Sequence, residues 1–270
     1  MPTDLKQAPV ESSSAAKRTQ GATLDGAESP QAAAKAVQQM FSDIAPRYDV
    51  LNHVLSMNVD RLWWWQTARR FDSVLKKNDV RVLDLCCGTG DMTFALQRRA
   101  HAEAKIFGAD FAHPMLHRAV LKSAQKSAKR PAELQNRPRW VEADAMQLPF
   151  ADSAFHLVTS AFGFRNLANY DDGLREILRI LKPGGECGIL ECAQPTGLFG
   201  KVYQVYFGQV LPRIGTALSG VTGPYSYLPA SVARFPKPPE MLERMHTAGF
   251  REASWTPYSF GIAGLYWGRK

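Results

Sequence analysis

The 270-residue chain has little cysteine, and this excludes several classes of protein. Its cysteines are Cys86, Cys87, Cys187 and Cys192. Four are too few for a disulfide framework in so long a chain, and they fit a reducing cytoplasm. Two are adjacent, two are five residues apart, and no histidine lies near either pair, so the spacing typical of zinc ligands is missing. We therefore expect a cytoplasmic protein with no metal site.

Long hydrophobic runs are also absent. The most apolar stretches, residues 155–164 and 186–193, have the length of buried strands and fall far short of the ~20 residues that span a bilayer. The net charge of +8 suits nucleic acid, an anionic membrane surface or acidic ligands. No RNA-binding module signature is present. We expect a soluble protein or one peripheral at the membrane surface, with no nucleic-acid partner.

The first 34 residues lack the apolar segment of a secretory signal. They are rich in Ala, Ser, Gln and Gly, and their acidic side chains at Asp4, Glu11, Asp25 and Glu28 argue against a mitochondrial transit peptide. We predict a disordered tail over 1–34 and a single domain over 35–270.

Beyond the tail, the pattern alternates between strands and helices. Residues 35–78 have helical spacing interrupted by a proline, and apolar strand-like runs then alternate with helical segments. The expected strands are 79–86, 104–110, 139–144, 155–162 and 186–192, followed by a final hairpin of 252–260 and 264–268. Alternation of this kind predicts an α/β fold with a doubly wound parallel sheet. An aromatic and proline-rich stretch, 196–238, interrupts it before the hairpin.

A glycine-rich turn follows the first predicted strand in VLDLCCGTGDMT, residues 82–93. The strand brings Asp84 to Gly88 and Gly90, and a helix begins directly afterwards. Glycines let a ligand approach the backbone, and the helix start offers free N–H groups. Asp110 ends the next strand, twenty residues after Gly90, where a carboxylate accepts both ribose hydroxyls of an adenine nucleoside.

The details of this turn narrow the choice of nucleoside. A dinucleotide fingerprint needs a third glycine where Thr93 stands, and no P-loop Gly-Lys-Ser/Thr occurs. Asp91 at the helix start suits a cationic ligand better than a pyrophosphate, which favours S-adenosylmethionine. Cys86 and Cys87 are interpreted as small packing residues, with a reactive thiolate at the helix start as the alternative.

From Val37 to the C-terminus the chain resembles the ubiquinone/menaquinone biosynthesis C-methyltransferases, which are class I S-adenosylmethionine enzymes. Four blocks carry the resemblance: FSDIAPRYDVLNHVLSMNVDRLWWW, the cofactor turn, AFGFRN, and LPRIG followed by YSYLPASVARFP. The resemblance implies a seven-stranded, Rossmann-like sheet. It also implies an N-terminal helical lid over 35–78 and a substrate-side insertion over 196–238.

The resemblance also implies roles in binding the cofactor. Thr93 and Asp110 stand at the family's cofactor positions, together with the turn residues Asp84, Gly88 and Gly90. Asp144 and Ala145 match the pair that borders the adenine. The family often has Asn in place of Asp144, and a carboxylate there still accepts a hydrogen bond from the adenine amino group.

The implied reaction moves a methyl group to a ring carbon of a polyprenyl quinol. Arg165 and Asn166 follow the fourth strand, where ligands bind in such sheets. Arg165 is expected to stabilise a phenolate, because its pKa above about 12 rules out a neutral base. Asn166 would orient the ring oxygen, and Tyr48 or Asp49 would accept the proton. The alternatives are a structural ion pair for Arg165 and helix packing or capping for Tyr48 and Asp49.

Aromatic clusters raise the question of lipid contact. Three consecutive tryptophans, Trp63–Trp65, cannot share one helix face, so some are expected in the core and the rest at a membrane interface. Tyr203, Tyr206 and Phe207 form a stripe that belongs either to the core or to a channel for the polyprenyl tail. Peripheral membrane contact and homo-oligomer formation remain open. The sequence also does not distinguish a benzoquinol from a naphthoquinol ring. The alternatives to the quinone methyltransferase are another small-molecule methyltransferase and a non-catalytic subunit of a quinone-synthesis complex.

Overall fold

The computed structural model describes most of the chain. The described residues are 21–22, 30–45, 48–49, 53, 56–129, 136–195, 197, 200, 203–204, 206–210 and 224–270. Most of the predicted tail lies outside them, and so does a large part of the predicted insertion.

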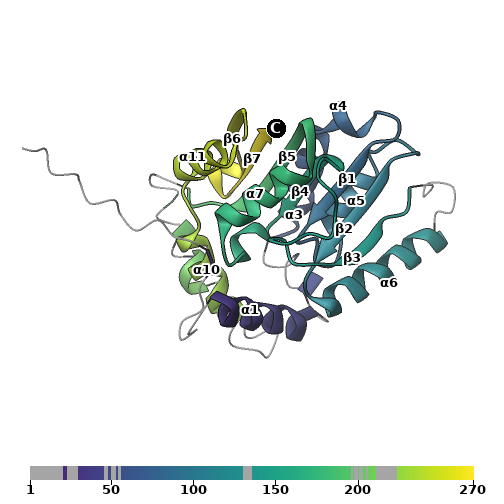
Figure 1. Ribbon diagram of the computed structural model, residues 1–270. Helices are drawn as coiled ribbons and strands as arrows, with labels where there is room; N and C mark the ends of the chain where they lie inside the picture. Colours follow the sequence, from purple (N-terminus) through teal and green to yellow (C-terminus); the bar gives the residue numbers. More distant parts are fainter. Residues whose placement is uncertain are drawn as a thin grey trace, which may run out of the picture.

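Seven strands form one sheet in the order β3-β2-β1-β4-β5-β7-β6 (Figure 1). The strands are β1 (Arg81–Leu85), β2 (Lys105–Asp110), β3 (Arg139–Glu142), β4 (Phe155–Ala161), β5 (Leu181–Cys192), β6 (Glu252–Tyr258) and β7 (Ala263–Arg269). β1 to β5 pair in parallel, whereas β7 runs antiparallel to both β5 and β6. The predicted doubly wound α/β fold with a terminal hairpin is confirmed.

Helices cover both faces of this sheet (Figure 1). The main ones are α1 (Pro30–Ile44), α3 (Val59–Arg70), α4 (Asp72–Leu75), α5 (Asp91–Gln97), α6 (His113–Lys129), α7 (Tyr170–Ile180), α10 (Pro224–Arg234) and α11 (Pro238–Ala248). Shorter turns are η3 (Phe164–Asn166), η4 (Tyr206–Val210) and η5 (Ser259–Gly261).

Two apolar layers form the core, one on each face of the sheet. One contains Phe155, Tyr170 and Ile177, and the other contains Phe71 and Leu75, all of them buried. A parallel sheet that is covered on both faces needs strands apolar on both sides, which is why the central strands read as continuous hydrophobic runs. The functional side chains must therefore lie at the strand ends.

Three local predictions were wrong. The first helix begins at Pro30, inside the predicted disordered tail, and Ala22 donates its backbone N–H to the Leu167 carbonyl at 2.7 Å. Helix α10 lies in the aromatic and proline-rich stretch 196–238, for which no helix was predicted, and it contains Pro229. Strand β5 starts at Leu181, five residues before the predicted strand 186–192, and its pairing with β4 is irregular in the added part.

The N-terminal helix lies across one edge of the molecule. Figure 1 shows α1 beside α6 and close to α10, and the Gln38 side chain donates to the Phe111 carbonyl at 2.5 Å. Phe41 and Tyr48, from this segment, line the cavity described below. The predicted lid over 35–78 thus has described residues that reach the cavity, while Asn52 within it is not described.

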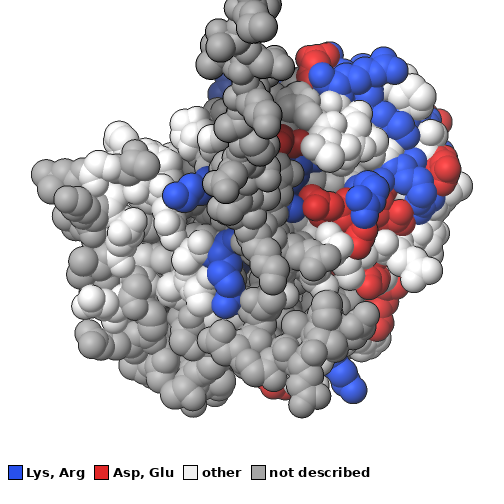
Figure 2. Space-filling model, turned by 60° about the vertical axis from the view of Figure 1, so that its left-hand side comes forward, with Lys and Arg blue, Asp and Glu red and all other residues white. Residues whose placement is uncertain are grey.

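The charge surplus is not spread evenly. Figure 2 shows one face on which basic and acidic side chains intermix over one half, whereas the other half is largely uncharged among the residues it colours. Among the residues coloured on that face, no continuous basic stripe of the kind that tracks a nucleic-acid backbone is visible. Within the described part of the chain, no helix has both the length and the apolar content needed to cross a bilayer.

Candidate active site

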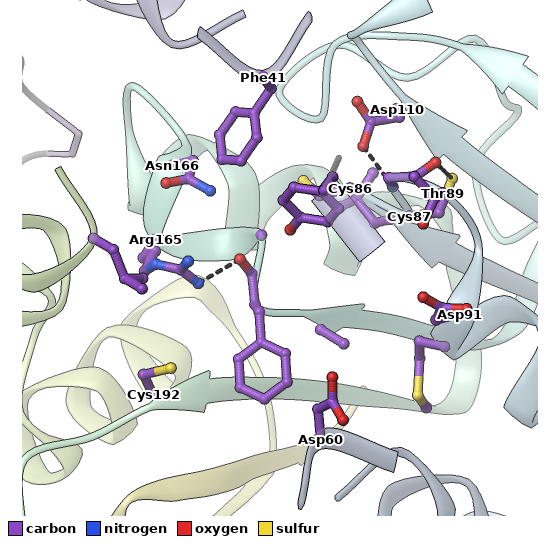
Figure 3. Close-up of a pocket in the computed structure, with 18 of the residues that line it drawn as sticks. Phe41, Asp60, Cys86, Cys87, Thr89, Asp91, Asp110, Arg165, Asn166 and Cys192 are labelled. Carbon is purple, nitrogen blue, oxygen red and sulfur yellow. Dashed lines mark hydrogen bonds between the residues drawn. The ribbon is translucent and has the colours of Figure 1, made fainter. Parts of the chain in front are cut away.

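A cavity of about 330 Å³ opens at the carboxyl ends of the central strands. Residues that follow β1, β2 and β4 line it, together with side chains from the N-terminal segment and from the chain after β5. Figure 3 shows the turn after β1 with Asp110 on one side, and Arg165, Asn166 and Cys192 on the other. Ligands of open α/β sheets bind at this edge.

The glycine-rich turn has the backbone that its sequence requires. Gly88 and Gly90 adopt φ of 53° and 88°, the left-handed region that glycine enters without strain. A Cβ on Gly90 would lie 2.6 Å from the Trp140 ring, so this glycine also allows tight packing. Gly88 lines the cavity, whereas Gly90 caps α5 behind it.

Asp110 lies where the ribose was expected. Its two carboxylate oxygens accept backbone N–H groups, one from Gly88 at 2.8 Å and one from Ala112 at 2.9 Å. Burial raises the pKa of this carboxyl, and the two backbone donors oppose the shift. Each carboxylate oxygen can accept a second hydrogen bond, so a fixed and unsaturated pair of acceptors lines the cavity.

Asp84 is the most deeply buried acid of the site. It accepts hydrogen bonds from the Thr93 and Thr159 hydroxyls at 2.6 and 2.8 Å. Burial outweighs these donors and raises the pKa of Asp84 to about 7. Asp84 lines the cavity, but Thr93 is fully buried behind it. The structure thus gives Thr93 an indirect place, holding Asp84, where a direct cofactor contact was predicted.

Asp144 and Ala145 line the cavity beyond β3, as expected. The Asp144 carboxylate accepts the Met146 N–H at 2.9 Å, which fixes its direction. Ala145 is buried and adds a small apolar side chain to this part of the cavity wall.

Arg165 forms a buried ion pair, the alternative that the sequence analysis left open for it, with Glu191, a partner that the sequence analysis did not name. Its Nη1 lies 2.9 Å from Glu191 Oε2, with exposed side-chain fractions of 7% and 0%. Burial is the largest single influence on the pKa of Arg165 and lowers it, but Glu191, Cys192 and Tyr48 together raise it by more, so the net direction is upward and the guanidinium stays charged. Nη1 also donates to the Phe162 carbonyl, as Figure 3 shows, while the buried Nε–H has no partner.

Asn166 is held by a residue of the predicted insertion. The Tyr227 hydroxyl, from α10, donates to Asn166 Oδ1 at 2.9 Å. This bond turns the amide so that its NH₂ group is the available end. Burial raises the pKa of Tyr227, which keeps it a proton donor.

The two predicted proton acceptors occupy different positions. Tyr48 lines the cavity. Asp49 accepts the Thr89 hydroxyl at 2.5 Å and pairs with Lys122 Nζ at 3.2 Å. Lys122 also lies 2.7 Å from Asp91, so this lysine links the N-terminal segment to the start of α5.

The cysteine thiols that line the cavity have raised pKa values, which keep them protonated. Burial raises the pKa of Cys86 and Cys87 well above the usual thiol range. Burial also raises the pKa of Cys192, which lies beside Arg165, to about 11. In the described part of the chain, no three His, Cys, Asp or Glu side chains gather to hold a metal ion.

The remaining wall of the cavity is apolar. The three tryptophans separate as their helix positions require: Trp63 is buried, Trp64 lines the cavity and Trp65 is half-exposed. Tyr203, Tyr206 and Phe207 also line the cavity, with the Tyr203 and Phe207 rings stacked at 5.4 Å.

Glu191, Tyr227 and Lys122 were missed by the sequence analysis. Glu191 stands at the carboxyl end of a predicted strand, and that position was a usable signal. Tyr227 lay within a quoted family block. Nothing local marks Lys122, because its partner Asp49 is 73 residues away.

Comparison with known proteins agrees with this geometry. A family model described as the ubiE/COQ5 methyltransferase family matches residues 29–270. A demethylmenaquinone methyltransferase of Deinococcus radiodurans is 46% identical over 237 residues, which cover 87% of this chain and 93% of that protein. The ubiquinone/menaquinone biosynthesis C-methyltransferase UbiE of Geobacter sulfurreducens is 40% identical, covering 87% and 88%.

Solved structures support the fold alone. A SAM-dependent methyltransferase of Thermotoga maritima has a TM-score of 0.56 at 16% identity, covering 86% of this chain and 99% of its own. One from Aquifex aeolicus has a TM-score of 0.51 at 17% identity, covering 72% and 84%.

Proposed function

This chain belongs to the ubiE/COQ5 methyltransferase family, and from that premise we propose that it methylates a ring carbon of a polyprenyl quinol. The protein is an S-adenosylmethionine-dependent methyltransferase. Relatives named for demethylmenaquinone favour a naphthoquinol as the substrate. The observation that carries the proposal is a cavity with a nucleoside-type wall facing a buried arginine and an amide.

The residues present fit the cofactor. Asp110 offers fixed acceptors for a ribose diol, and Asp144 with Ala145 offers an acceptor beside a flat apolar surface for adenine. Asp84 and Asp91 place carboxylates at the end of the cavity that the methionine ammonium would occupy. When bound, S-adenosylmethionine supplies an electrophilic methyl group.

The opposite wall fits the ring oxygen. A ring carbon ortho to a hydroxyl becomes nucleophilic as that hydroxyl loses its proton, so the site must stabilise oxyanion character. Arg165 lines the cavity with its charged guanidinium, and Asn166 offers its NH₂ group because Tyr227 occupies its carbonyl. The ion pair with Glu191 and the bond from Tyr227 hold these two side chains in place before the substrate arrives.

Tyr48 is the better placed of the two predicted proton acceptors. It lines the cavity, whereas the Asp49 carboxylate is occupied by Thr89 and Lys122. We assign Asp49 to holding the N-terminal segment against the cofactor turn. Tyr48, near Arg165, would pass the phenolic proton towards water.

The apolar wall fits the prenyl tail. Tyr203, Tyr206 and Phe207 come from the chain after β5 and face the same cavity as Arg165. A prenyl tail could follow this wall out of the cavity, and contact with a membrane surface is part of the proposal.

Complementation tests this function. A bacterial strain lacking its own demethylmenaquinone methyltransferase accumulates the demethyl quinone, and expression of this chain should restore the methylated species in lipid mass spectra. Arg165→Ala should leave the demethyl species in place while retaining cofactor binding. Continued accumulation of the demethyl quinone with the folded wild-type protein would contradict the proposal. Methylation of only a benzoquinone precursor would show that the substrate ring is a benzoquinol and not a naphthoquinol.

A further inference from the structure

Two strained turns present large apolar side chains to solvent. Met57 and Asn58 adopt φ of 52° and 60°, and Ser259 and Phe260 adopt 46° and 58°. Bulky residues rarely enter this left-handed region, and such strain gathers at functional sites. The strain is not explained by burial, because Met57 is 74% exposed and Phe260 is 89% exposed.

Both turns border the mouth of the same cavity. Ser56 and Met57 line it from one segment, and Ser259 and Ile262 line it from the other. The Trp63 indole N–H donates to the Ser259 hydroxyl at 2.8 Å, so α3 and η5 are joined directly. Although about 200 residues apart in sequence, the two turns form one rim.

Helix α3 follows the first of these turns directly, and it exposes further apolar and basic side chains. Leu62 and Trp65 are about half exposed, and Arg69 lies over the Trp65 ring at 5.2 Å. Arg61 is exposed on the same face, whereas the one acid of α3, Asp60, is buried and bonded to His53. Tryptophan with arginine and without carboxylates is typical of a membrane interface.

We propose that this rim docks onto an anionic phospholipid bilayer. The surface, called here the mouth surface, consists of Met57, Leu62, Trp65 and Phe260 with Arg61 and Arg69. The reason for such docking rests on the proposed function, because a prenyl tail anchored in the bilayer could then enter the cavity without crossing water. A second copy of the chain fits less well, because four separated apolar side chains give far less than the roughly 1,000 Å² of a stable interface.

Vesicle sedimentation with the full-length protein tests the apolar part. Phe260→Ser/Leu62→Ser removes two exposed side chains that do not line the cavity. Its partition onto vesicles of phosphatidylcholine and phosphatidylglycerol should fall about tenfold or more. The matched control is Val120→Ser/Leu121→Ser on α6, which removes side chains 46% and 48% exposed and should leave binding unchanged.

The basic part has its own test. Arg61→Gln/Arg69→Gln should weaken binding to vesicles containing phosphatidylglycerol, with little effect on pure phosphatidylcholine, and added salt should reduce the difference. Wild-type protein that does not sediment with either vesicle would overturn the proposal. Equal loss in the α6 control would also overturn it, as would a mouth variant that only dissociates a dimer in light scattering.

The lipid readout is independent of the proposed function, because it contains no quinol. With a short-tailed soluble quinol, Phe260→Ser/Leu62→Ser should keep wild-type turnover, while its KM for quinol embedded in vesicles should rise about tenfold. Vesicle binding without any methyl transfer would refute the proposed function and leave the mouth surface standing.

Discussion

At the scale of single residues, the buried pair of Arg165 and Glu191 determines the electrostatics of the reacting wall. Glu191 also accepts the backbone N–H of Arg165 at 3.0 Å and that of Cys192 at 3.2 Å. The carboxylate thus fixes both the guanidinium and the backbone that carries it. Because the two charges nearly cancel, Arg165 would act on a ring oxygen in the proposed reaction mainly through a directed hydrogen bond.

Glu191→Gln should destabilise the protein by about 3–5 kcal/mol, because it leaves a buried guanidinium without a counter-charge. The turnover number should fall with it, while S-adenosylmethionine affinity in the folded fraction should stay near that of the wild type. Urea unfolding and isothermal titration measure the two effects.

The double variant Arg165→Met/Glu191→Leu is the control for this prediction. It removes both charges, so it should recover much of the lost stability without recovering turnover. An active double variant would show that the pair has no part in the reaction.

The raised pKa of Asp84 predicts that the stability of the cofactor-free protein depends on pH. Its pKa is raised to about 7 in the folded state, from 3.8 as the ordinary value. The unfolded chain therefore loses this proton at lower pH than the folded protein, and stability must fall as pH rises from about 4 to 7. Compared with Asp84→Asn, the wild type should lose up to about 4 kcal/mol between pH 4 and 8. If the unfolding free energies of the two proteins changed equally with pH across that range, the raised pKa of Asp84 would be refuted.

The predictable residues are those whose role follows from local position. Asp110 ends a strand at a fixed distance from a glycine turn, so spacing alone singled it out, and in the structure it lines the cavity. Glu191 and Tyr227 could not be identified this way, since their partners Arg165 and Asn166 are 26 and 61 residues distant. Such pairs depend on which strand ends become neighbours in the sheet.

At the scale of elements, the site depends on how closely the turns after β1 and β4 approach. A Cβ on Gly163 would lie 2.3 Å from the Cys86 Cβ and 3.1 Å from the Cys86 carbonyl oxygen. Cys86 itself has φ of 52°, a value that glycine would adopt with less strain. The cofactor turn therefore packs directly against the segment that carries Arg165.

Gly163→Ala should push these turns apart and weaken S-adenosylmethionine binding by about tenfold or more, since overpacking costs roughly 1–3 kcal/mol. Isothermal titration measures the affinity. Adding Cys86→Gly removes the opposing Cβ and should restore most of it. Normal binding by Gly163→Ala alone would show that the turns tolerate separation.

Elements with a clear hydrophobic pattern were predictable, and α10 was not. The amphipathic α7 begins directly after Asn169, whose side chain accepts the N–H groups of Asp171 and Asp172 as a helix cap. In contrast, α10 has a proline inside it, so local propensity opposes the helix. Burial of Tyr227 and its bond to Asn166 supply a tertiary gain that local propensity does not include.

At the scale of the whole molecule, the sheet brings the two walls of the cavity face to face. The order β3-β2-β1-β4-β5 sets the ends of β1 and β2, which hold the cofactor turn and Asp110, beside the ends of β4 and β5. The alternation of strands and helices predicted the parallel sheet, whereas the strand order required the three-dimensional structure. The resemblance implied an N-terminal lid and a substrate-side insertion, but which of their residues line the cavity also required the structure.

The central claim is that the chain transfers a methyl group from S-adenosylmethionine to a ring carbon of a quinol. The most direct measurement incubates the purified full-length protein with trideuteromethyl cofactor and a short-tailed demethylnaphthoquinol, and mass spectrometry locates the label. We predict labelling on the ring carbon ortho to a hydroxyl with the reduced ring, and none with the oxidised quinone. Labelling on oxygen, or no transfer by protein that binds the cofactor in calorimetry, would contradict the account.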